Sequence, residues 1–346
     1  DFMNDIKNEY DRLRENHNKK YSSKNYISLE EARNNKLQID WKNQKIAKPN
    51  FLGIQTLKNY SLEEIKKYID WTPFFIAWEM KGKYPTIFEN EIYGEEAKKL
   101  FNDAQIILNK IVDENLLTAN AVYGIFPANS FNDGIQLYYD ESRENIKTVL
   151  HTLRQQEDKS ANLALADFIA PKNSGIDDYI GAFAVTTGIG VNELVKEFEE
   201  NHDDYNAIMV KAIADRLAEA FTELLHEKIR KEIWGYVSNE NFENSDLISE
   251  KYQGIRPAPG YPAQPDHTEK IALFNLLDVE NSIGISLTES LAMDPAASVC
   301  GLYFANPEAK YFNVGKLSKD QIEDYAKRKN MTFAEIEKWL APNLRY

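Results

Sequence analysis

The segment 254–269 restricts the possible folds of this chain more than any other. Four prolines and two glycines fall within its sixteen residues. Helix and strand interiors do not tolerate this proline density, and each residue before a proline is driven out of the helical region. We therefore predict a stiff, largely extended loop that presents Arg256 and Tyr261 to a ligand at low entropic cost. A plain surface connector is the alternative interpretation.

Composition limits the compartment and the partners expected for this chain. Cys300 is the single cysteine among 346 residues, so no internal disulfide forms, which favours a reducing, cytoplasmic compartment. Residues 1–20 are highly charged and lack a secretory signal, and no apolar stretch is long enough to span a membrane. A net charge of -14 disfavours nucleic acid as a partner. The small basic clusters 228–231 and 327–329 are interpreted as solvated helix faces.

Two parts of the chain differ in composition. Residues 1–40 are expected to be a helical lead-in or linker, and residues 41–346 the main domain. Ile6, Tyr10 and Leu13 recur at helical spacing, and Ser28 with Glu31 fits a capping box. The chain does not begin with Met, which fits a fragment of a larger protein.

Periodicity and capping signals predict a mixture of helices and strands. Helices are expected at 61–68, 91–113, 144–157, 193–234 and 266–279, and after the capping residues Ser318 and Thr332. Strands are expected at 121–126, 134–139, 163–170, 179–186, 299–304 and 311–314. This order lacks the regular β-α-β alternation of a doubly wound sheet, so a Rossmann-type fold is not expected.

Familiar catalytic motifs are missing from the sequence. Gly188 and Gly190 lack the third glycine of a dinucleotide fingerprint, and a strand-to-helix turn explains them. The five histidines are widely separated and show no metal-ligand spacing, so no metal site is expected. His202 and the two acids after it are interpreted as a helix start, and Cys300 as an inert core residue. We expect no catalytic residue in this chain.

A few polar side chains suit a charged ligand. Arg256 offers a planar fork for a carboxylate, and Asp70 lies beside an aromatic-rich segment. Tyr261 and Tyr311 offer ring faces to a purine or a cationic centre. These residues together predict a zwitterionic, cationic ligand that carries an aromatic base, provided that they meet in space.

The loop and many segments outside it match one protein family. The matching segments keep their order along the chain and extend over about residues 40–346: 70–75, 154–156, 167–171, 179–185, 202–205, 217–221, 256–262, 288–290, 310–312 and 339–344. Within the loop, Arg256, Gly260 and Tyr261 form an R-x-x-x-G-Y signature. This pattern resembles the C-terminal activation domain of cobalamin-dependent methionine synthase.

The resemblance implies a fold, a ligand and partners. It implies a curved single domain of mixed α+β type, with a central twisted antiparallel sheet flanked by helices. It also implies that S-adenosylmethionine binds here and supports the reductive remethylation of inactive cob(II)alamin. Cobalamin would be bound by another module of the same enzyme, and a flavodoxin-type protein would donate the electron. The cobalamin-anchoring D-x-H-x-x-G motif and zinc-binding cysteines of the family are absent, so the isolated domain is not expected to turn over alone.

The resemblance also assigns the site residues. The S-adenosylmethionine site would be lined by Asp70, Arg256, Ala258, Gly260, Tyr261, Tyr311, Phe312, Glu219 and Glu250. Arg256 would pair with the methionine carboxylate, and Asp70 with the amino group or another donor of the ligand. Glu219 and Glu250 would lie near the sulfonium. Gln264 replaces a cysteine found in some relatives. Two alternatives stay open: a stand-alone S-adenosylmethionine-dependent methyltransferase and a non-catalytic clamp on a cobalamin module.

Overall fold

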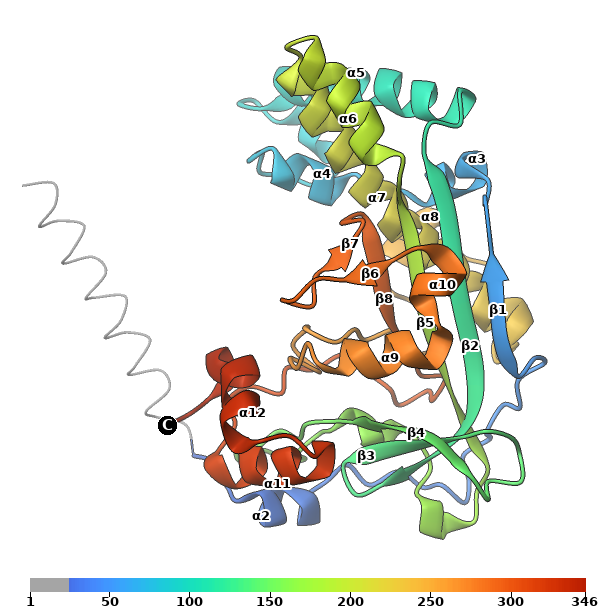
Figure 1. The fold of residues 1–346 in the computed structure, drawn as a ribbon, viewed down its shortest axis with the longest axis vertical. Helices are drawn as coiled ribbons and strands as arrows, with labels where there is room; N and C mark the ends of the chain where they lie inside the picture. The colour runs from blue at the N-terminus through green and yellow to red at the C-terminus, as the bar shows by residue number, and fades with distance from the viewer. Residues whose placement is uncertain (1–24) are drawn as a thin grey trace, which may run out of the picture.

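The structure, a computed structural model, describes residues 25–346 (Figure 1). The helix expected around Ile6, Tyr10 and Leu13 lies outside these residues. A six-stranded sheet forms the centre, in the order β4-β3-β2-β5-β8, with β1 paired to a second stretch of β2. Its strands are β1 (Gly53–Leu57), β2 (Thr118–Phe131), β3 (Gly134–Tyr138), β4 (Ile146–His151), β5 (Asp178–Ile189) and β8 (Ser298–Tyr303). A separate pair consists of β6 (Ser286–Leu287) and β7 (Met293–Asp294).

The strand pairs are all antiparallel, and most of the α-helices lie in two long connections, β1–β2 and β5–β6. The α-helices are α2 (Leu29–Asn34), α3 (Leu62–Ile65), α4 (Thr72–Ala77), α5 (Gly94–Asp113), α6 (Val191–Glu200), α7 (Asp204–Lys228), α8 (Asn244–Ile248), α9 (Glu269–Leu277), α10 (Val279–Ile283), α11 (Lys319–Lys329) and α12 (Phe333–Leu340). Short 3₁₀ helices span Lys66–Tyr68, Thr86–Glu89, Leu165–Phe168, Lys172–Ser174 and Ala341–Asn343, and a π-helical turn spans Ile229–Ile233. This mixed architecture, a central antiparallel sheet flanked by helices, confirms the predicted fold class.

The sheet has a hydrophobic core on each face, because successive side chains of a strand point to opposite sides. Tyr123 of β2 and Phe183 of β5 belong to the core covered by α5 and α7. Val122, one position before Tyr123, and Ile180, three positions before Phe183, belong to the core covered by α9 and α10. Figure 1 shows β2 and β5 as the long strands around which these layers are built.

The last part of the chain adds a third, smaller core around α11 and α12. Helix α2, which lies within the expected lead-in, packs against it. The Leu29 amide donates to Asp320 at 2.6 Å, and Arg33 bridges Asp133 and Asp324, each at 2.7 Å. The end of the expected lead-in is therefore joined to the rest of the chain by specific polar contacts.

Several local predictions are confirmed. The turn at 132–133 joins β2 to β3, and Gly190 opens helix α6 with a left-handed φ of 98°. Asp203 caps α7 through the Asn206 amide, as the acids at 203–204 predicted. The capping boxes at Ser28 and Thr332 are both formed. At Ser318, however, no side-chain cap bond is made.

Three predicted elements are wrong. Residues 144–157 do not form a helix, since 146–151 become β4 and pair with β3; β-branched side chains there suit a strand. Residues 163–170 contain a 3₁₀ helix instead of a strand, because Asp167 turns inward to bind buried Arg154. Residues 311–314 form no strand, and their Val314 amide donates to Pro262 of the loop at 2.8 Å.

The long periodic stretch at 193–234 and the two basic clusters also differ from expectation. The stretch is divided into α6 and α7 by a break at 201–203. Arg230, in the first basic cluster, is fully buried, and Lys329, in the second, is only 8% exposed along its side chain. Neither cluster is simply a solvated face, because these cations neutralise buried carboxylates.

Candidate functional site

The proline-rich loop lies against the end of β8. Ile255 exchanges two backbone hydrogen bonds with Phe304, at 3.0 and 3.1 Å, and the Leu302 amide donates to the Pro257 carbonyl at 2.9 Å. The prolines occupy positions where the sheet needs no donor from the loop. The loop is thus irregular, as predicted, and backbone hydrogen bonds join it to β8 and Phe304 on both sides of Arg256.

Gly260 makes the tight turn that follows Arg256. Its φ is 93°, and its amide donates to the Gln264 carbonyl at 2.7 Å. A Cβ at this position would lie 2.4 Å from Cε1 of His267. Both the left-handed backbone and the close approach of the imidazole ring therefore demand glycine.

Helix α7 supplies the charged wall opposite the loop. Glu219, Glu223 and His226 follow one another at spacings of four and three, with Arg230 four positions further on, so they share one side of the helix. Glu223 Oε2 lies 2.6 Å from Nη2 of Arg256, and His226 Nδ1 lies 3.0 Å from its Nη1. The loop and the helix meet at this ion pair.

Two adjoining pockets open on either side of Arg256. Their volumes are about 380 and 420 Å³, and both are lined by Glu219, Glu250 and Arg256. The first is charged, and Asp70 lies in its wall. The second is more apolar and is lined chiefly by the loop, β8 and the segment at 311–312. Together they form a continuous site with a polar end and an aromatic end.

Eight of the nine predicted site residues line these two pockets: Asp70 and Arg256 with Glu219 and Glu250 around the first, and Ala258, Tyr261, Tyr311 and Phe312 around the second. Gly260 lines neither and acts through the turn. Tyr261 and Tyr311 are 60% and 43% exposed, so their rings are accessible. Asp70 accepts from the Thr72 amide at 2.9 Å, at the start of α4.

The electrostatics of the first pocket favour a cationic ligand. Four carboxylates and two guanidinium groups line it, which leaves it net negative. Burial raises the pKa of Glu223, although Arg256 and Arg230 oppose this shift. Burial lowers the pKa of the His226 imidazole well below its usual value, and the two arginines add to the effect, so this ring is neutral at pH 7.

Sequence reasoning missed Glu223, His226 and Tyr252, whose hydroxyl contacts Nη1 of Arg256. A signal for the two helix residues was present, since they continue the polar stripe of Glu219 beside an apolar stripe on the same helix. Tyr252 had no such signal, because its contact depends on how the loop folds back.

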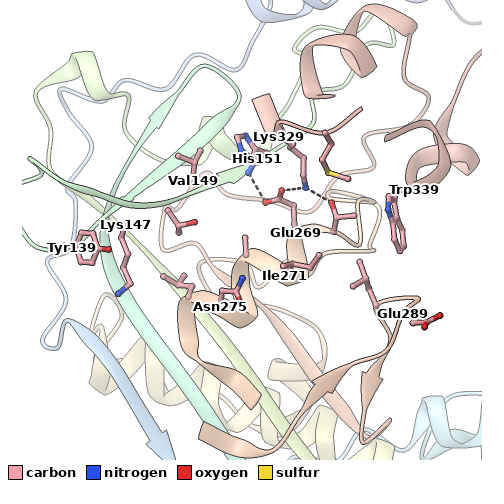
Figure 2. A pocket seen from close by; sticks show the side chains of 16 residues that line it. Tyr139, Lys147, Val149, His151, Glu269, Ile271, Asn275, Glu289, Lys329 and Trp339 are labelled. Atoms are coloured by element: carbon pink, nitrogen blue, oxygen red, sulfur yellow. Dashed lines mark hydrogen bonds and ion pairs between the residues drawn. The ribbon is translucent and has the colours of Figure 1, made fainter. Parts of the chain in front are cut away.

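A larger pocket of about 800 Å³ lies elsewhere, between β4, α9 and the C-terminal helices (Figure 2). Its buried cation, Lys329, is already held by Glu269 at 2.5 Å and by Asp266 at 2.7 Å. Burial and the nearby Arg328 and Lys329 lower the pKa of His151 to about 4, so its ring is neutral. Within this pocket, the Lys329–Glu269 ion pair joins α11 to α9, and Glu269 also accepts from the His151 amide at the end of β4.

Within residues 25–346, no group of three or more His, Cys, Asp or Glu side chains is arranged to hold a metal ion. In the same residues, no helix has both the length and the apolar character that crossing a membrane requires. Cys300 is buried in the second core, as predicted, and burial raises the pKa of its thiol to about 12.

Fold and site together define a mixed α/β module built on an antiparallel sheet, with charged and aromatic pockets beside the proline-rich loop. Residues 61–330 match the family described as "Vitamin B12 dependent methionine synthase, activation domain". The chain belongs to this family. It is also similar to a solved structure described as the crystal structure of the MetH reactivation domain bound to AdoHcy. That match has 54% sequence identity and a TM-score of 0.91, and covers 93% of this chain and 99% of that one.

Proposed function

We propose that this domain binds S-adenosylmethionine in the two adjoining pockets around Arg256. The observation that carries the proposal is the meeting of a fixed guanidinium, free carboxylates and accessible aromatic rings in one continuous site. The similar MetH domain was solved with AdoHcy, the demethylated form of the same ligand, which supports this choice.

The charged parts of S-adenosylmethionine and its adenine are each assigned to groups of the two pockets. Arg256 pairs with the methionine carboxylate, and Asp70 accepts from the amino group. Glu219 and Glu250 form no ion pair with any residue of the described chain, so they are available to favour a positive sulfonium. The adenine lies in the second pocket.

The second pocket suits a flat base. Tyr261, Tyr311 and Phe312 contribute aromatic surface, while Ala258 offers backbone groups from the loop. Gly260 keeps the backbone turn tight enough for this arrangement.

The wider role is the reductive remethylation of inactive cob(II)alamin. Cobalamin, bound by another module of the enzyme, supplies a reduced cobalt that accepts the methyl group. This domain contributes the placement of the donor, and proximity is its main effect. In this proposal the domain works in the cytoplasm and does not turn over alone.

A flavodoxin-type protein donates the electron. The basic cluster 228–231 offers little free charge for docking this donor, because Arg230 is buried against Glu240 and Lys231 pairs with Glu227 at 3.1 Å. Only Lys228 of that cluster remains without an ion pair within the described chain. The donor therefore needs a different or a broader surface.

Calorimetric titration with S-adenosylmethionine tests the binding proposal. Arg256→Ala is expected to weaken binding by about 1.5–3 kcal/mol, because it removes a charged hydrogen bond to the ligand. Lys147→Ala, in the larger pocket, is the matched control and should leave the affinity unchanged. Failure of the intact protein to bind, or a loss in Lys147→Ala alone, would contradict the assignment.

A further inference from the structure

We propose that Glu223 is a positioning residue for Arg256 and thereby sets the preference of the site for ligands that carry a carboxylate. This inference rests on the proposed function, since it concerns the same pocket. It assigns a role to a side chain that the family resemblance did not supply.

The first step concerns the donors of Arg256. Its Nη1 contacts His226 Nδ1 at 3.0 Å and the Tyr252 hydroxyl, and its Nη2 forms an ion pair with Glu223 Oε2 at 2.6 Å. Within residues 25–346, its Nε makes no hydrogen bond. The Nε–H and one Nη2–H therefore remain for a ligand oxygen. The side chain is 17% exposed and lines both pockets.

The second step concerns what holds Glu223. Its side chain is 9% exposed, and its Oε1 lies 3.7 Å from Nη1 of Arg230. The Nε and Nη2 of Arg230 donate to the Glu240 carboxylate at 2.6–3.1 Å. The centre of the Tyr252 ring lies 4.0 Å from the guanidinium carbon of Arg230. Glu223 thus lies between Arg230, which is fully buried, and Arg256, which lines the pockets.

The third step concerns the alternatives open to Arg256. Glu219 and Glu250 line both pockets with it and carry no competing ion pair within the described chain. Without the charge of Glu223, Arg256 is free to turn toward either of these carboxylates. It would then be withdrawn from the ligand carboxylate and would also neutralise the groups that attract the sulfonium.

Glu223→Gln, which keeps the shape and removes the charge, tests the inference with two ligands. S-adenosylhomocysteine carries the carboxylate, whereas 5′-methylthioadenosine keeps the adenosine and the thioether but lacks the amino-acid end. We expect the variant to bind S-adenosylhomocysteine about tenfold more weakly, the size of one charged hydrogen bond, and methylthioadenosine with unchanged affinity. In the Arg256→Ala background, Glu223→Gln should have no further effect on either ligand.

Tyr252→Phe is a milder second variant, because it removes only the hydroxyl contact to Nη1 and leaves the ring on Arg230. It should weaken S-adenosylhomocysteine binding about threefold and spare methylthioadenosine. Two results would overturn the positioning role: equal losses of affinity for both ligands, or unchanged S-adenosylhomocysteine affinity in folded Glu223→Gln protein. Either result would leave the proposed function intact. If the intact protein binds neither ligand, the proposed function itself is wrong.

Discussion

At the scale of single residues, the site depends on groups that the protein interior holds in one state. Arg256 keeps its charge beside Glu223, and its neighbour His226 is kept neutral by burial. Gly260 is a residue of a different kind, since it contributes no chemistry of its own. It permits the backbone to turn beneath an imidazole ring, and the geometry of the whole loop follows from that turn.

Gly260→Ala is expected to destabilise the domain by about 1–3 kcal/mol, because alanine resists a φ of 93° and its Cβ meets His267. It should also weaken S-adenosylmethionine binding, since the loop that carries Arg256 must shift. Urea denaturation and calorimetry measure the two effects.

Gly175 provides the control, because its φ of 70° is also left-handed but no atom lies within 4 Å of an added Cβ. Gly175→Ala should cost less and leave ligand affinity intact. Equal behaviour of the two variants would show that the clash with His267 is unimportant.

At the scale of elements, a buried ion pair decides the local structure around 154–168. Arg154 is 1% exposed, and its guanidinium binds Asp133 from the β2–β3 turn and Asp167 from the 3₁₀ helix at 2.6–2.8 Å. It also donates to the Asn162 carbonyl at 2.6 Å. One side chain thus joins a turn, a loop and a helix, and so prevents the strand that the apolar pattern at 163–170 suggests.

Arg154→Met should destabilise the protein by about 3–5 kcal/mol, since it leaves Asp167 buried without its cation and Asp133 with Arg33 alone. Lys98→Ala is the comparison, because the exposed Lys98–Glu95 pair at 3.1 Å is worth at most about 0.5 kcal/mol. Chemical denaturation of both variants checks this. A loss of stability below about 1 kcal/mol for Arg154→Met would show that the two carboxylates become hydrated or protonated in the variant and are not left as buried, uncompensated charges.

At the scale of the whole molecule, stability is distributed unevenly among three hydrophobic cores. Strand β5 pairs with β2 on one edge and β8 on the other, and helices cover both of its faces. The third core is much smaller, and α12 packs mainly on α11. The proline-rich loop lies beside β8 of the central sheet.

Hydrogen exchange should follow this division, because an amide exchanges when its own region opens. Amides of β5 are expected to be the most protected, with exchange close to the global unfolding limit, whereas those of α12 should exchange much sooner. Mass spectrometry of peptides from 178–189 and 333–340 compares them directly. Similar protection of the two segments would mean that the three cores unfold as one unit.

Sequence patterns alone determined the features that depend on neighbouring residues. Proline density predicted the loop, alternation with a turn at 132–133 predicted β2 and β3, and caps at Ser28 and Thr332 marked helix starts. The resemblance carried by Arg256, Gly260 and Tyr261 gave the family. All of these signals are local, because backbone restriction, strand alternation and capping act over a few residues.

Only the tertiary structure decided which distant groups meet. It paired 146–151 with β3 as a strand, and it turned 163–170 into a 3₁₀ helix around Arg154. It also placed Glu223 against Arg256. A buried charge takes whichever partner the folded chain brings within reach, and the cost of leaving it unpaired exceeds most local preferences. Local sequence patterns do not predict which distant charged groups will pair.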